Sequence, residues 1–505
     1  MKSRTEIKNG VILSYLLIFI NMMYGLLITP FILKYVGTVD YGVYKSVASL
    51  SASLAVLDLG LCATMTRYMS KYNAENDREN ASNFAAMIMV QFMVLAGAIA
   101  CLGIVFVISL DTIYAATFSA EAMHLARKLL VFLLLNMVLR LFENLLIGIA
   151  NGYEHFTLSN GVRIAALISK ILLILVVLPI NHNIVAIVAL ETVITLLATA
   201  VLIVYIIRKI GIVPRLKRWD KRLFRESFGY TGLMFLQTLT VQFNGNVDNI
   251  LIGARLGAVS VTVYSVALQL FGMYETLSGS IANIMLPNIS KRIAMGQTSA
   301  ELQQVVEKCG RMQFMILGAA LGGFIVLGKD FFLLWLGPGY QDSYYIALML
   351  MIPVTFTMMQ NVTLSILRAR NKMVYRTVTL MVSCLINIVV SVTSMRYIGY
   401  WGTALGTVAS TVCNLVFMNT YYHVKLDFKI LSLFAHILHR IAPCAITTTA
   451  VVYCVHSYFH GTWVSFIINA ALYIVIYVAL LLCWGLEKEE KHLLLGYAGV
   501  RRNRK

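Results

Sequence analysis

Several charged side chains interrupt long apolar stretches of this sequence, where an unpaired charge is energetically costly. They are Lys45, Asp58, Arg140, Glu143, Arg163, Lys170, Glu191, Asp248 and Glu275. A charge in such a setting marks a transport pathway or an internal ion pair. The four cations all fall in the N-terminal half of the chain. Lysine and arginine give charge-assisted hydrogen bonds to phosphate oxygens, so their chemistry suits an anionic ligand.

The spacing of these residues indicates how they are grouped. Arg163 and Lys170 are seven residues apart and share one face of a helix. Arg140 and Glu143 are three apart, so we expect them to pair with each other. Two interpretations stay open, a cationic cavity for an anion or a set of interhelix ion pairs without a ligand, and we favour the cavity. Lys45 and Arg163 lie near expected helix ends, where long cations also reach the membrane surface.

The acidic residues are candidates for ion coupling or for pairing with the cations. Glu275 lies near the middle of its apolar stretch, and a buried carboxyl group there could exchange protons during transport. Ion coupling or pairing with the cations is also the role that we expect for Glu143, Glu191 and Asp248. Asp58 and Asp248 lie close to expected helix ends, where helix capping and water offer an ordinary structural explanation.

The composition requires a membrane environment. The 505 residues are 59% hydrophobic and 13% charged, with a mean hydropathy of +0.79, whereas soluble domains carry roughly a quarter charged residues. This excludes a cytosolic enzyme, a disordered chain and a secreted disulfide scaffold. The eight cysteines form no CxxC pair, and most lie in apolar runs, as small core residues do.

An apolar helix of roughly 20 residues crosses a bilayer, and the sequence predicts an all-α polytopic membrane protein with about fourteen such helices. The expected spans are Val11–Ile32, Tyr41–Met65, Phe84–Ile108, Leu129–Ile149, Val162–Leu178, Ile184–Ile207, Phe228–Phe243, Val259–Met285, Met312–Leu327, Tyr344–Ile366, Val378–Met395, Trp401–Phe417, Leu433–Val455 and Trp463–Trp484.

The basic residues predict the orientation. If the N-terminus is cytoplasmic, the inward segments carry roughly five times as many Lys and Arg residues as the outward loops, which is the bias expected of inward segments. This also explains the net charge of +18 without nucleic-acid binding. We therefore expect a multi-pass protein of the cytoplasmic membrane with both termini inside the cell.

An internal repeat predicts the domain organisation. Gly37, Val39, Val43 and Tyr44 recur 220 residues later as Gly257, Val259, Val263 and Tyr264. We expect a six-helix lobe over residues 1–207, a basic amphipathic linker helix over 208–227 lying on the anionic inner leaflet, and a second six-helix lobe over 228–422. Two further transmembrane helices over 423–485 and a basic cytoplasmic tail over 486–505 complete the chain.

Five stretches together resemble the Wzx-type polysaccharide flippases of the multidrug/oligosaccharidyl-lipid/polysaccharide (MOP) exporter superfamily. They are Ile32–Tyr44, Leu57–Leu61 with Arg67, Ser70 and Tyr72, Ala150–Tyr153 with Phe156 and Asn160, Val247–Asn249 with Gly253 and Gly257, and Leu334–Tyr340. The resemblance spans essentially the whole chain and implies a MATE-like fold of two six-helix lobes around a cavity. It fixes no universal catalytic residue.

The resemblance implies transport of an undecaprenyl-pyrophosphate-linked oligosaccharide from the inner to the outer leaflet by alternating access, for cell-surface polysaccharides such as O-antigen. Assembly proteins and a polysaccharide polymerase are the implied partners, with membrane lipids around the chain. A MATE-like cation-coupled drug antiporter and a lipid II flippase remain alternatives. The basic residues inside the N-terminal spans favour an anionic substrate over an exported drug cation.

Enzymatic, cofactor and metal chemistry are not expected. The outward loops are too short to hold a catalytic domain, and we assign no catalytic residue and no cofactor. Gly323 to Lys329 has the spacing of a phosphate-binding loop, but Asp330 follows where Ser or Thr is needed. The histidines of the last third lack a matched carboxylate in the sequence, which argues against a metal site: His436, His439, His456 and His460.

Overall fold

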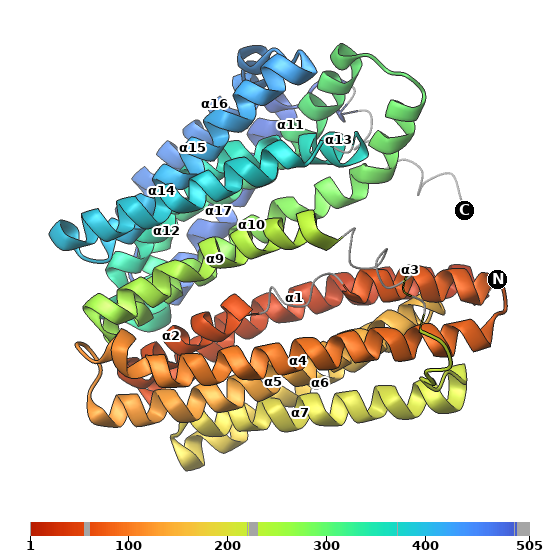
Figure 1. Cartoon of the computed structure of the whole chain (residues 1–505). Coiled ribbons are helices and arrows are strands. Elements are labelled where there is room, and N and C mark those ends of the chain that lie inside the picture. Colours follow the sequence, from red (N-terminus) through yellow and green to blue (C-terminus); the bar gives the residue numbers. More distant parts are fainter. Residues whose placement is uncertain are drawn as a thin grey trace, which may run out of the picture. The chain divides into compact units, whose positions relative to one another are not determined.

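The computed structural model describes residues 2–54, 61–219, 221, 231–370, 372–488 and 490–491. Within these ranges the regular elements are helices, and no strand occurs among them. The chain divides into two compact units, Met1–Ser265 and Val266–Lys505, each with its own internal packing. Figure 1 labels the helices of both units.

The described part of the first unit is built from helices. They are α1 (Lys2–Val36), α2 (Thr38–Leu54), α3 (Leu61–Ala74), α4 (Arg78–Tyr114), α5 (Ala120–Gly152), α6 (Phe156–Asn181), α7 (Ile184–Tyr205) with its π-helical extension η2 (Ile206–Ile210), α9 (Thr231–Leu256) and the start of α10 (Ala258–Ala294).

The second unit contains the rest of α10 and the later helices. They are α11 (Ser299–Leu336), the 3-10 turn η3 (Pro338–Tyr340), α12 (Gln341–Met359), α13 (Thr363–Ala369), α14 (Val374–Ile398), α15 (Trp401–Leu426), α16 (Ile430–His456), α17 (Trp463–Leu480) and η4 (Leu481–Gly485). The predicted span Tyr344–Ile366 is divided here between α12 and α13 by a turn at residues 360–362.

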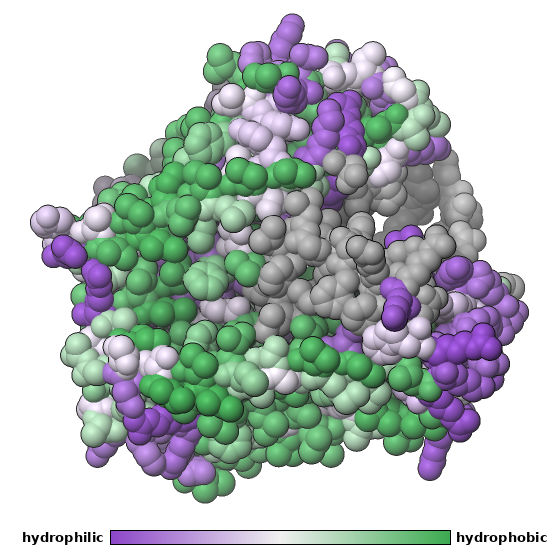
Figure 2. Space-filling model, viewed as in Figure 1, coloured by the Kyte–Doolittle hydropathy of each residue, from purple (hydrophilic) through white to green (hydrophobic). Residues whose placement is uncertain are grey.

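Where the structure describes them, the predicted spans fall on a helix or on two consecutive helices, which confirms the all-α polytopic fold. Eleven helical segments in the described part of the chain are long and apolar enough to cross a membrane. In the first unit, Figure 2 shows hydrophobic residues over the middle of the helices and hydrophilic residues near both ends. A lipid-facing band with polar rims has this distribution, because hydrocarbon excludes charged groups and the headgroup layers accept them.

The two copies of the repeated motif adopt the same local backbone. Gly37 has φ +87° directly before α2, and Gly257 has φ +84° directly before α10. Glycine is suited to both positions because a side chain is strained at positive φ. In each copy the glycine ends one helix and lets the next begin immediately, so the matched residues mark a shared structural feature.

The linker differs from the helix predicted for residues 208–227. Residues 211–219 form no helix. Gly211 has φ +78° and ends η2, and Pro214 cannot donate a backbone hydrogen bond to a helical turn. Leu223 and Phe224, which would share the apolar face of that helix, lie outside the described residues.

Candidate functional site

A polar pocket of about 340 Å³ lies within the first unit, between α1, α5, α6 and α7. Five of the residues singled out in the sequence line it, and we call it the charged pocket. These five are Arg140, Glu143, Arg163, Lys170 and Glu191. The structure thus brings together charges from three consecutive helices, α5, α6 and α7.

Helical periodicity explains how each helix contributes to the pocket. Its lining residues follow steps of three or four along α1 (Leu17, Asn21, Tyr24), α5 (Arg140, Glu143, Asn144), α6 (Arg163, Ala166, Leu167, Lys170) and α7 (Glu191, Ile194, Thr195, Ala198). Such steps keep side chains on one helix face. The predicted shared face of Arg163 and Lys170 is therefore confirmed.

Glu191 is the central ionic group of the charged pocket. Its Oε2 lies 2.7 Å from Lys170 Nζ, and its Oε1 lies 2.7 Å from Arg140 Nη2. The side chains of Glu191 and Lys170 are only 15% and 16% exposed, whereas that of Arg140 is 56% exposed. One carboxylate therefore links a largely buried ammonium group to a more open guanidinium group, and it offsets the repulsion between the two cations.

Arg140 does not pair with Glu143 as its spacing suggests. Its Nε donates to Asn136 Oδ1 at 2.9 Å, and its Nη2 reaches across to Glu191 on α7. The prediction was wrong because the neighbouring helix α7 presents Glu191, whose carboxylate accepts from the Arg140 guanidinium. Within the described residues, Glu143 makes no ion pair within 4.0 Å.

Arg163 is held by an amide instead of a carboxylate. Its Nη2 donates to Asn144 Oδ1 at 3.3 Å. The pocket contains three cations and two carboxylates, so its formal charge is +1 when all five groups are ionised. Lys170 also lies 5.1 Å from the centroid of the Tyr24 ring, which favours a cation. The cations of this pocket have the chemistry to donate charge-assisted hydrogen bonds to an anion.

The remaining sequence candidates lie elsewhere. Lys45 on α2 lies over the rings of Tyr41 and Tyr44, at 5.3 and 5.9 Å from their centroids, and does not line the charged pocket. Glu275 is on α10 in the second unit. Asp58 lies outside the described residues.

Asp248 belongs to a buried hydrogen-bond network. Its Oδ2 accepts a hydrogen bond from the Tyr264 hydroxyl at 2.7 Å. The neighbouring Asn249 donates to Ser49 Oγ at 3.0 Å and accepts from Ser265 Oγ at 3.1 Å. These bonds join α2, α9 and the start of α10, so the geometry favours a structural role for Asp248.

Sequence analysis missed a buried cation in the second unit. Arg311 on α11 donates from Nε and Nη2 to the two oxygens of Glu490, each at 3.0 Å, and to the carbonyls of His436 and Gly485. Burial alone would raise the pKa of Glu490, but the hydrogen bonds from Arg311 and from the Glu487 N–H, together with the charges of Arg311 and Lys308, hold that pKa below its usual value. The only sequence signal was a cation directly before the predicted span Met312–Leu327.

One histidine has an acidic neighbour that sequence analysis did not foresee. His456 Nε2 lies 3.5 Å from Asp330 Oδ2, although the two residues are on α16 and α11. The statement that this histidine group lacks a matched carboxylate was therefore wrong for His456. In the described ranges, no group of three or more His, Cys, Asp or Glu side chains is arranged to hold a metal ion.

Solved structures share this fold. The lipid II flippase MurJ in an inward closed conformation is similar with a TM-score of 0.71 and 14% identity over 93% of this chain and 97% of that one. An inward-facing multidrug resistance MATE transporter of the MOP superfamily has a TM-score of 0.65 and 14% identity over 82% and 98%. An outward-facing one has 0.54 and 15% over 85% and 94%.

At such low identity these likenesses establish the fold alone, which the chain shares with MurJ and the two MATE structures. A search among curated protein sequences found no match. A family model described as "Polysaccharide biosynthesis protein" matches residues 7–292, more than half of the chain and all four helices of the charged pocket. The chain therefore belongs to the polysaccharide biosynthesis protein family.

Proposed function

We propose that the protein is a flippase that moves an undecaprenyl-pyrophosphate-linked oligosaccharide from the inner to the outer leaflet of the cytoplasmic membrane. The family membership and the transporter fold support this class of function. The observation that carries the substrate proposal is the charged pocket, where Arg163 has an amide partner and the cations outnumber the carboxylates. In this proposal the pocket binds the pyrophosphate while the lipid tail stays in the bilayer.

The depth of the pocket supports a role in crossing the membrane. Arg140 lies twenty residues after the start of α5 and twelve before its end, about 30 and 18 Å along the axis. Lys170 lies about 21 Å from the start of α6 by the same measure. Charges this far inside apolar helices are costly unless they are paired or serve a polar substrate. A headgroup in transit needs polar contacts at this depth.

The ion pairs of Glu191 allow the pocket to release the substrate as well as to bind it. A pyrophosphate can engage Arg163 directly and then compete with Glu191 for Arg140 and Lys170. Because Glu191 takes back these cations when the substrate departs, it limits how tightly the anion is held. Alternating access then requires no covalent chemistry, only alternate exposure of the pocket to the two sides of the membrane.

Replacement of the two arginines tests this proposal. We expect Arg140→Ala combined with Arg163→Ala to lower the flux of a fluorescent undecaprenyl-pyrophosphate-linked oligosaccharide in proteoliposomes by at least tenfold, because each loses a charge-assisted hydrogen bond. Arg127→Ala is the matched control, since Arg127 pairs with Asp111 in the same unit but does not line the pocket. Full flux by the double variant, with normal membrane insertion, would refute the substrate assignment.

Two other transporter functions are compatible with the fold, a lipid II flippase and a cation-coupled drug antiporter. Competition in the same assay distinguishes them, because lipid II competes only if the pocket accepts a peptidoglycan precursor. An organic drug cation should not compete, since the formal charge of the pocket is positive. Inhibition by a drug cation together with insensitivity to the pyrophosphate lipid would favour an antiporter. Dependence of flux on an imposed proton or sodium gradient would show whether transport is ion-coupled.

A further inference from the structure

The segment that follows α7 is fixed across one end of the first unit. We call residues 208–219 the basic strap. Ile212 is fully buried in the core cluster formed with α3, α4 and α5. The side chain of Asn83 on α4 accepts hydrogen bonds from the backbone N–H groups of Lys217 and Arg218 at 2.7 and 3.0 Å, and donates to the Arg218 carbonyl at 2.9 Å. One amide therefore holds two consecutive peptide units.

Two more contacts fix the strap against the first turns of α4. The Arg215 N–H donates to the Ser82 carbonyl at 3.2 Å. The Lys217 ammonium lies 2.9 Å from Glu79 Oε1, with both side chains well exposed. Because the backbone is held, the exposed side chains of residues 215–219 are kept on the outer surface without helix formation.

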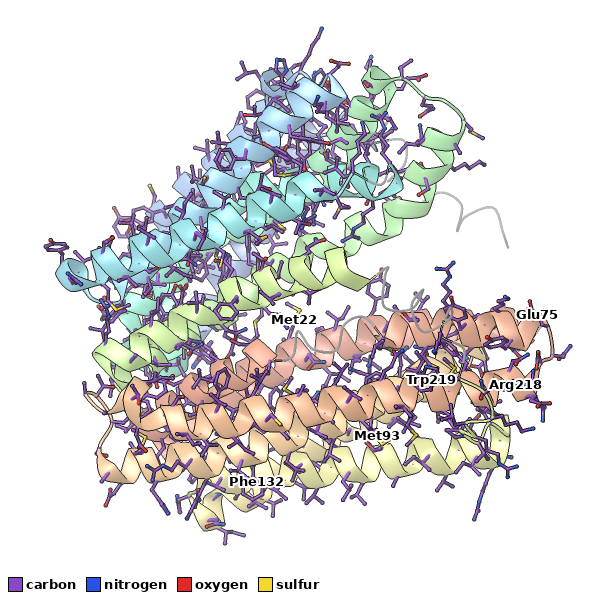
Figure 3. The ribbon with its side chains drawn as sticks, in the orientation of Figure 1. Met22, Glu75, Met93, Phe132, Arg218 and Trp219 are labelled. Atoms are coloured by element: carbon purple, nitrogen blue, oxygen red, sulfur yellow. The ribbon has the colours of Figure 1, made fainter. Side chains whose placement is uncertain are left out.

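The strap carries exposed cations and exposed large apolar side chains. Arg208, Lys209, Arg215, Lys217 and Arg218 are all exposed, and so are Leu216 and Trp219. Figure 3 shows Arg218 and Trp219 at the same end of the first unit as Glu75. Of the nearby carboxylates, Glu79 pairs with Lys217 and Glu75 lies 4.0 Å from Lys71. Positive charge therefore remains in excess along the strap.

The ends of two candidate membrane spans meet at the strap, so we infer that it lies near the lipid headgroups. It begins within η2, where the span Ile184–Ile210 ends, and it crosses to α4, whose span begins at Arg78. Tryptophan is favoured at the membrane interface, and cations near the surface attract anionic lipids. Exposed cations beside an exposed tryptophan and leucine match both chemical parts of a phospholipid, the anionic headgroup and the first methylenes of the acyl chains.

We propose that the basic strap is a binding site for anionic phospholipid headgroups, preorganised by the hydrogen bonds of Asn83. The site is separate from the charged pocket and does not depend on which substrate the protein transports. Its occupant is a resident membrane lipid with a phosphodiester anion. A zwitterionic phospholipid would be held less tightly because its headgroup carries no net charge.

The test compares phosphatidylglycerol with phosphatidylcholine on the full-length protein. We expect Arg215→Gln, Lys217→Gln and Arg218→Gln together to lower the preference for phosphatidylglycerol, measured by native mass spectrometry, at least tenfold. The control is Arg368→Gln, Arg370→Gln and Lys372→Gln, which removes the same charge from the last turn of α13 and the connection to α14. An equal loss in the control would overturn the proposal, because bulk charge would then explain it.

Asn83→Ala separates preorganisation from charge. It keeps every cation of the strap but removes all three hydrogen bonds to residues 217 and 218, so we expect at least threefold weaker phosphatidylglycerol binding. Wild-type binding by Asn83→Ala would refute the role of Asn83.

A further measurement needs no charge variant. Trp219 is the single tryptophan in a variant with Trp335→Phe, Trp401→Phe, Trp463→Phe and Trp484→Phe. In this variant, spin-labelled phosphatidylglycerol should quench Trp219 fluorescence more than spin-labelled phosphatidylcholine. Equal quenching by the two lipids would overturn the lipid site.

Discussion

Glu191 neutralises part of the positive charge in the charged pocket. It accepts from two cations on two different helices, and each bond uses its own carboxylate oxygen. Glu143 lines the same pocket without such a bond. Two glutamates of equal charge therefore differ in how many cations each one holds, and this difference can be measured.

We expect Glu191→Gln to bind undecaprenyl pyrophosphate about tenfold more tightly than wild type and to transport it more slowly. The formal charge of the pocket rises from +1 to +2, and about 1.4 kcal/mol of added attraction corresponds to this factor. Native mass spectrometry would give the affinity and a proteoliposome assay the rate. Glu143→Gln removes the same charge without breaking an ion pair and should have a smaller effect. Weaker binding by Glu191→Gln would contradict competition between Glu191 and the substrate.

From the sequence, it was easier to predict which residues line the pocket than to predict which of them form ion pairs. Regular helical spacing placed Arg163 and Lys170 on one face, and this needs only the geometry of a single helix. The bond from Arg140 to Glu191 joins residues 51 positions apart, so it depends on the packing of α5 against α7. The hydrogen bonds between Asn83 and residues 217 and 218 also depend on tertiary packing, and no local sequence pattern predicts them.

At the scale of elements, the continuity of apolar residues was sufficient to predict the helices, because a membrane-spanning helix must satisfy its backbone hydrogen bonds internally. What it could not predict is how closely two helices approach. Gly42 on α2 faces the start of α10, where a Cβ atom at this position would lie 1.9 Å from the Ala258 carbonyl oxygen and 2.8 Å from Thr262 Oγ1. The Thr262 hydroxyl also donates to the Thr38 carbonyl at 2.6 Å.

Gly42→Ala should therefore destabilise the first unit. The obstructing atom belongs to the backbone and cannot rotate away, so α2 and α10 must separate, at a cost of about 1–3 kcal/mol for overpacking. Thermal unfolding in detergent would report the loss. Gly97→Ala on α4 is the matched control, because a Cβ there meets nothing within 4 Å and alanine favours a helix by about 1 kcal/mol. Equal melting temperatures for the two variants would contradict the close approach.

At the scale of the whole molecule, tertiary contacts hold the ends of the helices in place, while lipid surrounds their apolar middles. The basic strap fastens one end of the first unit through Asn83. In the second unit, Arg311 on α11 binds the chain after η4 through Glu490 and also contacts Glu487 at 3.3 Å. The Arg311 side chain is only 3% exposed, so its charge depends on these partners. Removing one partner of a buried ion pair costs about 3–5 kcal/mol.

This pair predicts how the stability of the protein depends on pH. The pKa of Glu490 is lower in the folded protein than its ordinary value, about 4.3 in an unfolded chain. The carboxylate therefore stabilises the fold fully above that value, and the contribution is lost as the pH falls through the lower, folded pKa.

We expect the melting temperature to fall more steeply below about pH 4.3 in wild type than in Glu490→Gln. Glu487→Gln should keep most of the wild-type slope, because Glu487 is 45% exposed and makes the longer contact. Identical pH profiles for wild type and Glu490→Gln, measured from neutral pH to about pH 3.5, would mean that Arg311 is not held by this carboxylate.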